Sequence, residues 1–143
     1  MLPNHSTIIK NISRDFDGRG SILSIVDCNV KNVSIITSAA NTIRSNHYHL
    51  EDFHFMYVLQ GQIDYFFKDK DNKKLRYLAV QEGQTIFTPN LELHATYFPV
   101  ETTLIVSSKN PRDRQTYEKD TVREVIITHE NIYNLKAALN GIE

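Results

Sequence analysis

Four histidines of the 143-residue sequence lie in two short stretches, at spacings that suit a common site. His47, His49 and His54 occur in SNHYHLEDFHF, and His94 occurs in PNLELHATYF. Residues two apart on a β-strand project from the same face, so His47 and His49 are expected to point the same way. An imidazole ring can bind a divalent metal ion or transfer a proton near neutral pH. If the strands that carry these residues are neighbours in a barrel, all four rings can meet at one interior point.

The segments around the histidines are typical of β-strands. Short apolar segments follow one another at intervals of roughly 8–12 residues, which favours an antiparallel sandwich or barrel over alternating strands and helices. Turn signals separate them, among them Gln60–Gly61, Glu82–Gly83 and Pro89–Asn90. The predicted strands are Ser21–Asp27, Val33–Thr37, His47–Leu50, Phe53–Leu59, Gln62–Lys68, Leu75–Val80, Thr85–Thr88, His94–Phe98 and Thr103–Ser107.

One helix is predicted at the C-terminal end, over about residues 129–140. Thr128 can cap it and Gly141 can end it. The length and the 41% apolar content suit a single domain spanning residues 1–143. The 16 Lys and Arg residues nearly balance the 17 Asp and Glu residues, giving a net charge of -1. That balance argues against a nucleic-acid-binding protein that relies on a basic surface.

The cysteine content and the apolar runs of the sequence indicate the cellular compartment of the protein. Cys28 is the single cysteine, so it cannot form a disulfide within the chain. No apolar run approaches the ~20 residues needed to span a bilayer, and residues 1–19 lack the apolar centre of a signal peptide. We therefore expect a cytoplasmic protein with no membrane span.

The histidines and the turn residues around them resemble the two motifs of the cupin superfamily, G-x5-H-x-H-x(3,4)-E-x6-G and G-x5-P-x-G-x2-H-x3-N. Six of the ten motif positions match, and 21 residues separate the two motifs. The resemblance implies an all-β cupin fold, a jelly-roll antiparallel β-barrel over about residues 17–124, followed by the short C-terminal helix. The matching residues are His47, His49, Gly61, Gly83, Pro89 and His94.

Four motif positions differ from the cupin pattern. Asn41 and Leu91 replace glycines, Phe98 replaces Asn, and His54 stands where Glu is expected. Asn tolerates the left-handed conformation that glycine serves, whereas His54 changes the ligand set. Four neutral imidazoles would leave a divalent ion its full charge of +2 and make it a stronger Lewis acid. The resemblance thus implies a divalent metal (Zn, Fe, Ni or Mn) on His47, His49, His54 and His94.

Metal-bound histidines normally need a partner on the second ring nitrogen. The candidate partners are Glu92, Gln60, Thr88 and Tyr57.

Two flanking stretches narrow the resemblance to the nucleotide-sugar cupins. Asp17–Leu23 (DGRGSIL) resembles their D-x-R-G-x-[FL] opening, and Arg44–His49 (RSNHYH) resembles their R-G-x-H-x-[HQ] strand, with Ser45 in place of Gly. These cupins include dTDP-4-dehydrorhamnose 3,5-epimerases, dTDP-sugar 3,4-ketoisomerases and the zinc-binding cupin domain of capsular-polysaccharide reductases.

That resemblance implies roles for individual residues. In the metal-free epimerases and ketoisomerases, the histidine that matches His47 removes a proton next to a keto group, which suits a ring with a pKa near ~6.5. If His47 binds a metal, it cannot also act as a free base. Arg44 and Arg19 are candidates to bind a nucleotide diphosphate through paired hydrogen bonds. The candidate proton donors are Tyr57, Tyr97 and Tyr48.

Three functions are compatible with these residues. The first is an epimerase or isomerase acting on a keto-sugar nucleotide in surface-polysaccharide biosynthesis, which the motifs around Arg19 and Arg44 favour. The second is a non-haem metal-dependent oxygenase or lyase of another small molecule, which all-histidine ligation favours. The third is a non-enzymatic, metal-stabilised module for a small ligand, which Leu91 and Phe98 favour if they close the site.

The partner of this protein is accordingly expected to be a small molecule. Open sheet edges in a small barrel also need cover. We therefore expect a homodimer in which the N-terminal segment or the C-terminal helix is exchanged between copies.

Overall fold

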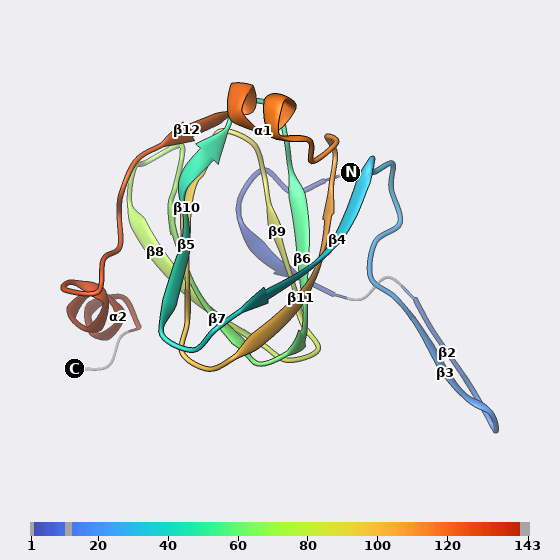
Figure 1. The fold of residues 1–143 in the computed structure, drawn as a ribbon. Coiled ribbons are helices and arrows are strands. Elements are labelled where there is room, and N and C mark those ends of the chain that lie inside the picture. Colours follow the sequence, from blue (N-terminus) through green and yellow to red (C-terminus); the bar gives the residue numbers. More distant parts are fainter. Residues whose placement is uncertain (1, 11–12, 141–143) are drawn as a thin grey trace.

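The computed structural model describes residues 2–10 and 13–140, in which two five-stranded antiparallel sheets face each other (Figure 1). The first sheet contains, in order, β1 (Thr7–Ile9), β9 (Thr85–Thr88), β6 (His54–Gln60), β11 (Thr102–Ser108) and β4 (Asn32–Ser38). The second contains β12 (Thr121–Arg123), β5 (Thr42–His49), β10 (Leu93–Phe98), β7 (Gln62–Lys68) and β8 (Leu75–Gln81).

Four further elements lie outside the two sheets (Figure 1). The strands β2 (Ser13–Asp17) and β3 (Gly20–Ser24) form a hairpin that projects away from the barrel. The helix α1 (Arg114–Asp120) lies over one end of the barrel, and α2 (Ile132–Leu139) packs on the outer face of the second sheet. Among the residues described, no helix is long and apolar enough to cross a membrane.

The sequence of β7 explains why both faces of the second sheet are apolar at its centre. Ile63 and Tyr65 point between the sheets and pack in one cluster with Val58 of β6. Phe66 points the opposite way and packs in a second cluster with Ile132 of α2. Because successive side chains of a strand alternate between faces, a strand buried on both sides needs a second covering layer, which α2 supplies.

An ion pair between a buried aspartate and a partly exposed lysine links α2 to this face. The Asp64 carboxylate is fully buried, and its Oδ2 lies 3.0 Å from Lys136 Nζ on α2. Tyr77 Oη and Gln62 Nε2 donate hydrogen bonds to its Oδ1, at 2.6 and 3.1 Å. The contact of Oδ2 with a cation therefore exists only while α2 is docked.

We expect Lys136→Met to lower the free energy of unfolding by about 1–3 kcal/mol, because it leaves a buried carboxylate without its cation. Urea unfolding of the variant measures this loss. Lys119→Met, at an exposed lysine of α1, is the control and should change stability by less than about 0.5 kcal/mol. Equal stabilities for the two variants would contradict the role given to the pair.

The structure confirms the predicted all-β fold with antiparallel strands and a short C-terminal helix. Each of the nine predicted strands overlaps an observed strand. Four observed elements were not predicted, namely the five-residue strand β2, the seven-residue helix α1 and the strands β1 and β12. β1 and β12 have three residues each, too few to show an alternating pattern. They form because β9 and β5 offer them paired edges.

Two boundaries differ from prediction. Residues 7–9 join the first sheet although the barrel was expected to start at about residue 17, and residues 13–24 leave it as the hairpin. The C-terminal helix begins at Ile132 rather than at about residue 129, because Asn131 is its N-cap; Thr128 Oγ1 instead accepts a hydrogen bond from the Asn131 amide. The predicted stop at Gly141 lies outside the described residues.

Backbone conformation explains where the motif tolerates replacement of glycine. The motif glycines that remain, Gly61 and Gly83, have φ of 101° and 84°. Asn41, Ser45 and Leu91 stand where the cupin motifs have glycine, and their φ angles are 64°, 70° and 64°. The backbone that the glycines serve is therefore kept although the residues have changed.

Leu91 is the replacement with the least suitable side chain, since a left-handed conformation costs a non-glycine residue about 1–2 kcal/mol. We expect Leu91→Gly to raise the free energy of unfolding by about 0.5–1 kcal/mol, after the entropy that glycine adds to the unfolded chain. Leu59 is equally exposed, at 51%, but lies in β6 and is not among the described residues with positive φ. Leu59→Gly should therefore destabilise the protein, and a loss of stability in both variants would contradict the strain at Leu91.

Candidate functional site

A bulge interrupts β5 immediately before its two histidines. Arg44 pairs with Thr96 of β10 and His47 pairs with His94. Two residues of β5 therefore lie between these pairs, where β10 has one. The residues that take up the extra step, Ser45 and Asn46, have φ of 70° and 54°. Residues three apart face opposite sides of a regular strand, but the bulge turns Arg44 and His47 to the same side.

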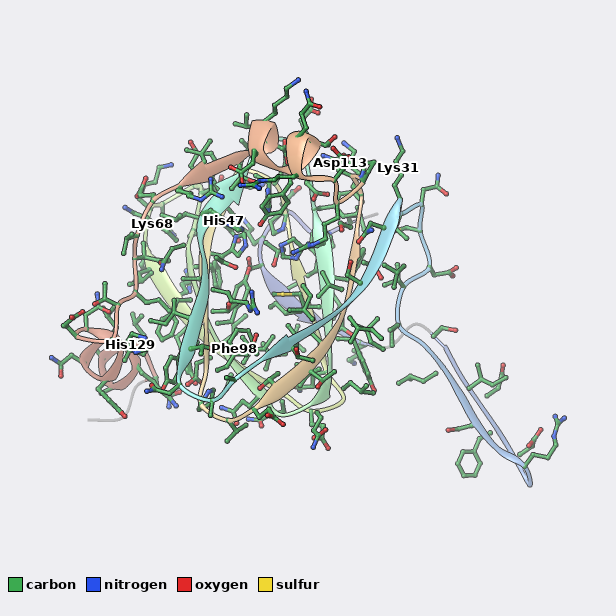
Figure 2. All side chains as sticks on the ribbon, in the orientation of Figure 1. Lys31, His47, Lys68, Phe98, Asp113 and His129 are labelled. Carbon is green, nitrogen blue, oxygen red and sulfur yellow. The ribbon has the colours of Figure 1, made fainter. Side chains whose placement is uncertain are left out.

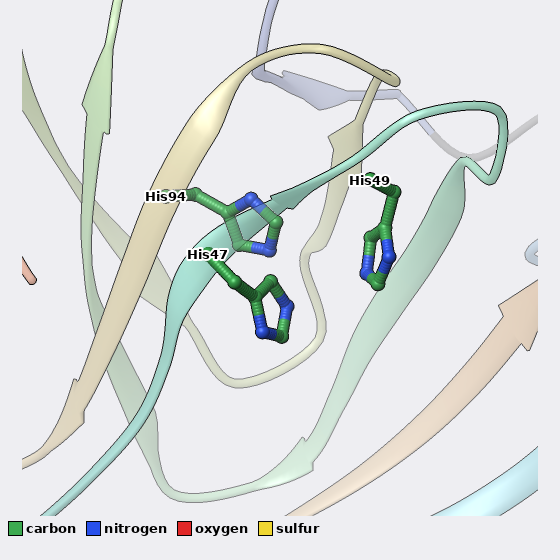
Figure 3. Close-up of side chains that lie close together, drawn as sticks. All are labelled: His47, His49 and His94. Atoms are coloured by element: carbon green, nitrogen blue, oxygen red, sulfur yellow. The ribbon is translucent and has the colours of Figure 1, made fainter. Parts of the chain in front are cut away.

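The predicted histidines meet inside the barrel (Figures 2 and 3). The ring centroid of His47 lies 4.6 Å from that of His49 and 4.9 Å from that of His94. One ring nitrogen of each of these three lies within 4.8 Å of the others. His54, from the facing sheet, borders this trio, with its centroid 5.4 Å from His94 and 5.8 Å from His49. All four side chains are buried.

Two ring nitrogens at this point have no hydrogen-bond partner in the part of the chain that the structure describes. His94 Nδ1 lies 3.0 Å from the backbone oxygen of Glu92, so Nδ1–H can donate there and leave Nε2 as an acceptor. His94 Nε2 and His54 Nδ1 are buried and have no hydrogen-bond partner among the described residues. An unsatisfied buried polar atom costs about 1–3 kcal/mol. These nitrogens therefore suit a bound ligand, and a divalent metal ion fits the donor set.

Carboxylate and hydroxyl groups face the outer side of His49. Its Nδ1 lies 3.6 Å from Asp120 Oδ2 and 3.4 Å from Thr121 Oγ1. Of the predicted partners for second ring nitrogens, Glu92 contacts His94 through its backbone, whereas Thr88 Oγ1 is bonded to Tyr65 Oη. Partners of this kind fix the orientation of a ligating ring.

Burial keeps the four rings neutral. Desolvation, followed by the neighbouring imidazoles, lowers the pKa of His47 to about 2. Desolvation also lowers the pKa of His94 to about 4 and lowers the pKa values of His49 and His54. A neutral imidazole is the form that binds a metal ion, so at neutral pH no proton needs to leave.

The histidines line a cavity of about 130 Å³ between the sheets. Arg44 also lines it and bridges to β4, donating to Ser38 Oγ at 2.7 Å and to the Thr37 carbonyl at 3.0 Å. Apolar side chains form the deeper wall, and Phe98 lies further from α1 than His47 does (Figure 2). These apolar residues are Ile36, Met56, Phe98, Leu104 and Val106.

Two residues of the site were missed from the sequence. Tyr117 of α1 lines the cavity, and its ring centroid is 5.4 Å from His49 and 6.1 Å from His47. Arg112 also lines the cavity and lies 5.3 Å above the Tyr117 ring. Burial raises the pKa of Tyr117. The available signal was the N-cap of α1, Asp113, whose carboxylate accepts a hydrogen bond from the Thr116 amide at 3.0 Å.

Three predicted site residues do not join the histidines. Tyr57 alternates with the inward-facing Met56 and therefore points to the outer face of its sheet. Tyr97 packs in the outer cluster beneath α2 and donates to Asn41 Oδ1 at 2.7 Å. Arg19 lies on the projecting hairpin, 91% exposed, paired with Asp17 at 2.7 Å. Of the predicted catalytic and substrate-binding residues, the structure places His47 and Arg44 in the cavity.

No protein-family model and no curated protein sequence matches the chain. Solved structures do match it. A mutant of the 3,4-ketoisomerase QdtA from Thermoanaerobacterium thermosaccharolyticum, in complex with TDP-4-keto-6-deoxyglucose, is 16% identical with a TM-score of 0.67, over 99% of this chain and 100% of that one.

Two further enzymes have the same architecture. The WlaRB TDP-quinovose 3,4-ketoisomerase from Campylobacter jejuni is 18% identical with a TM-score of 0.69, over 85% of this chain and 95% of that one. The rmlC epimerase of Mycobacterium tuberculosis is 13% identical with a TM-score of 0.63, over 78% of this chain and 66% of that one. The chain therefore has the cupin fold of the nucleotide-sugar enzymes, as its motifs predicted.

Proposed function

We propose that this protein is an isomerase or epimerase of a keto-sugar nucleotide, of the kind used in surface-polysaccharide biosynthesis, and that its histidines hold a divalent metal ion. The observation that carries the proposal is the set of four buried, neutral histidines around one cavity. The fold supports it, since enzymes of the same architecture include a 3,4-ketoisomerase in complex with TDP-4-keto-6-deoxyglucose.

Such a reaction removes a proton from the carbon next to the keto group and forms an enolate that needs positive charge nearby. An epimerase returns a proton to the other face of that carbon. A ketoisomerase instead delivers a proton to the former carbonyl carbon, while the neighbouring hydroxyl loses its proton and becomes the new keto group. A divalent ion, when bound, would polarise the carbonyl as a Lewis acid. Arg44 and Arg112 line the cavity and supply positive charge beside the reacting atoms. The buried walls exclude water, which strengthens these interactions.

The proton-transfer group in this proposal is Tyr117 rather than Tyr57 or Tyr97. Its ring packs against His47 and His49 and lines the cavity, whereas the other two point to the outer faces of the sheets. His47 is a weak base when its pKa is about 2, and a His47 bound to a metal has no free lone pair. The Tyr117 hydroxyl can give a proton at the cavity wall, and the Asp52 carboxylate, which also lines the cavity, can take the proton that leaves the carbon.

The size of the cavity limits what it can enclose. A cavity of about 130 Å³ is smaller than the ~300–1,000 Å³ of most small-molecule sites. It can enclose the reacting part of a sugar, while the nucleotide would lie outside.

The test uses TDP-4-keto-6-deoxyglucose in deuterated buffer with zinc-loaded protein, followed by proton NMR. We expect deuterium to enter the sugar at the carbon next to the keto group, and Tyr117→Phe to slow this exchange by about 100-fold or more. Tyr97→Phe is the matched control and should exchange at the normal rate. No exchange with this or other nucleotide-linked keto sugars would overturn the proposal.

A second candidate is favoured by the cavity volume and the absence of a carboxylate among the four predicted ligands. A metal-dependent oxygenase or lyase of a small molecule would fit both features. Oxygen consumption by iron-loaded protein with small organic acids would support it in place of the isomerase.

We also propose that the active unit is a homodimer joined through the projecting hairpin. A two-stranded hairpin is marginal on its own, yet this one exposes Phe16 by 82% and Ile22 by 67%. The free edge of the first sheet, β4, exposes Val33 and Ile35 next to it in sequence. A second copy offers both surfaces in return, which is the condition for a two-fold interface. Light scattering should give about twice the 16.5 kDa chain mass, and the double variant Phe16→Ser, Ile22→Ser should give a monomer.

A further inference from the structure

Asn46, the second residue of the β5 bulge, is bound entirely to a segment about 80 residues further along the chain. Its Oδ1 accepts hydrogen bonds from the amides of Ile126 and Ile127, at 2.9 and 3.1 Å. Its Nδ2 donates to the Ile127 carbonyl at 3.1 Å, and its backbone oxygen accepts from the Glu124 amide at 3.0 Å. Both polar atoms of the side chain are therefore satisfied by backbone of the segment that leads to α2.

The conformation of the bulge is unfavourable for its sequence. Ser45 and Asn46 are consecutive non-glycine residues with positive φ, a region that such residues visit singly and rarely. Strained backbone persists where the surroundings hold it in place. The hydrogen bonds of the Asn46 side chain can do so, because they tie the bulge to Ile126 and Ile127, beside the bond from the Glu124 amide to the Asn46 backbone oxygen.

The bulge decides which side chains reach the cavity. Without the extra residue, strict alternation would place Arg44 and His47 on opposite faces of β5, and one of them would turn toward the outer cluster beneath α2. With it, Arg44, His47 and His49 all line the cavity. A one-residue change in register would therefore break up the site while leaving the strands paired.

We propose that Asn46 is a positioning residue: by holding the bulge against the 124–127 segment, it turns His47 and Arg44 into one cavity. The inference rests on the proposed function for the role of that cavity, but the geometry it describes can be measured without metal or substrate. It also makes the docking of the C-terminal segment a requirement for the site, since Ile127 packs in the same outer cluster as Ile132 of α2.

The test compares two asparagines that bind the same segment. Asn46→Ala removes three side-chain hydrogen bonds at the bulge. Asn131→Ala removes bonds to the Thr128 amide and the Ile126 carbonyl, but Asn131 stands at the N-cap position of α2 and these bonds do not involve β5. One readout is zinc affinity by competition with a chelator. The other is the NMR contact between the rings of His47 and His94 in metal-free protein, whose centroids lie 4.9 Å apart.

We expect Asn46→Ala to lose the contact between these rings and to bind zinc about 10–100-fold more weakly. Asn131→Ala should keep both properties even if its stability falls. Asn46→Asp, which keeps the acceptor for the two amides and tolerates positive φ, should recover most of the affinity. Retention of the ring contact and of full zinc affinity in Asn46→Ala would overturn the proposal.

Two outcomes separate this inference from the metal proposal. If the unmodified protein binds no zinc, the metal site is wrong, and the ring contact still tests Asn46. If Asn46→Ala does not fold, Asn46→Gly replaces it, because glycine adopts the bulge conformation without strain but lacks the amide. A ring contact as strong in Asn46→Gly as in the unmodified protein would then count against the role of the side chain.

Discussion

In the His94→Gln variant, zinc affinity is expected to fall by at least about 100-fold. Zinc in small protein sites is held by about 10–16 kcal/mol over four ligands, so one ligand accounts for roughly 3 kcal/mol. His94 is fully buried, its Nδ1 faces the Glu92 carbonyl, and its Nε2 has no partner among the described residues. The loss should therefore come from a missing ligand and not from a broken hydrogen bond.

Competition with a chromophoric chelator measures the affinity, and elemental analysis gives the stoichiometry. His129→Gln is the control, because His129 is exposed and lies next to α2 (Figure 2). It should bind one zinc per chain with unchanged affinity. If the unmodified protein retains well below one metal ion per chain, or if both variants bind equally, the ligand assignment is wrong.

The second large effect is a loss of stability in mild acid. In metal-free protein we expect the free energy of unfolding to fall by about 3–4 kcal/mol between pH 7 and pH 5 from His47 and His94 alone. Burial lowers the pKa of His47 to about 2 and that of His94 to about 4, whereas an unfolded histidine titrates near ~6.5. Below pH ~6.5 the unfolded chain therefore binds protons that the folded chain does not.

Stability is highest above pH ~6.5 and falls as the pH drops, until His94 titrates in the folded state at about 4. His5 acts in the opposite direction, since its hydrogen bond to Glu92 raises its pKa. However, the His5 side chain is 38% exposed, so solvent screens its contribution.

Urea unfolding at pH 5, 6, 7 and 8 with a chelator present measures the slope. The double variant His47→Gln, His94→Gln should have a much flatter pH dependence, and His129→Gln should match the unmodified protein. A stability that does not change between pH 7 and pH 5 would show that the rings are accessible to protons in the folded state.

The residue pattern by itself determined the strands and the identity of the histidine set. β-Branched segments such as Val33–Thr37 and the turn at Glu82–Gly83 are local signals, because alternation and turn chemistry depend on a few neighbouring residues. His47, His49 and His94 also stand at the histidine positions of the cupin motifs, and each lies at a fixed distance from a turn. These local features were enough to predict the fold.

Tertiary structure alone decided which other side chains belong to the site. Tyr57 was predicted as a proton donor and Tyr117 was not, but the first faces outward and the second faces the histidines. Arg44 and His47 share a cavity because of a bulge held by Asn46 and Ile127, residues 81 apart in the chain. Contacts over such distances depend on how complete sheets and helices pack, which no local pattern of residues encodes.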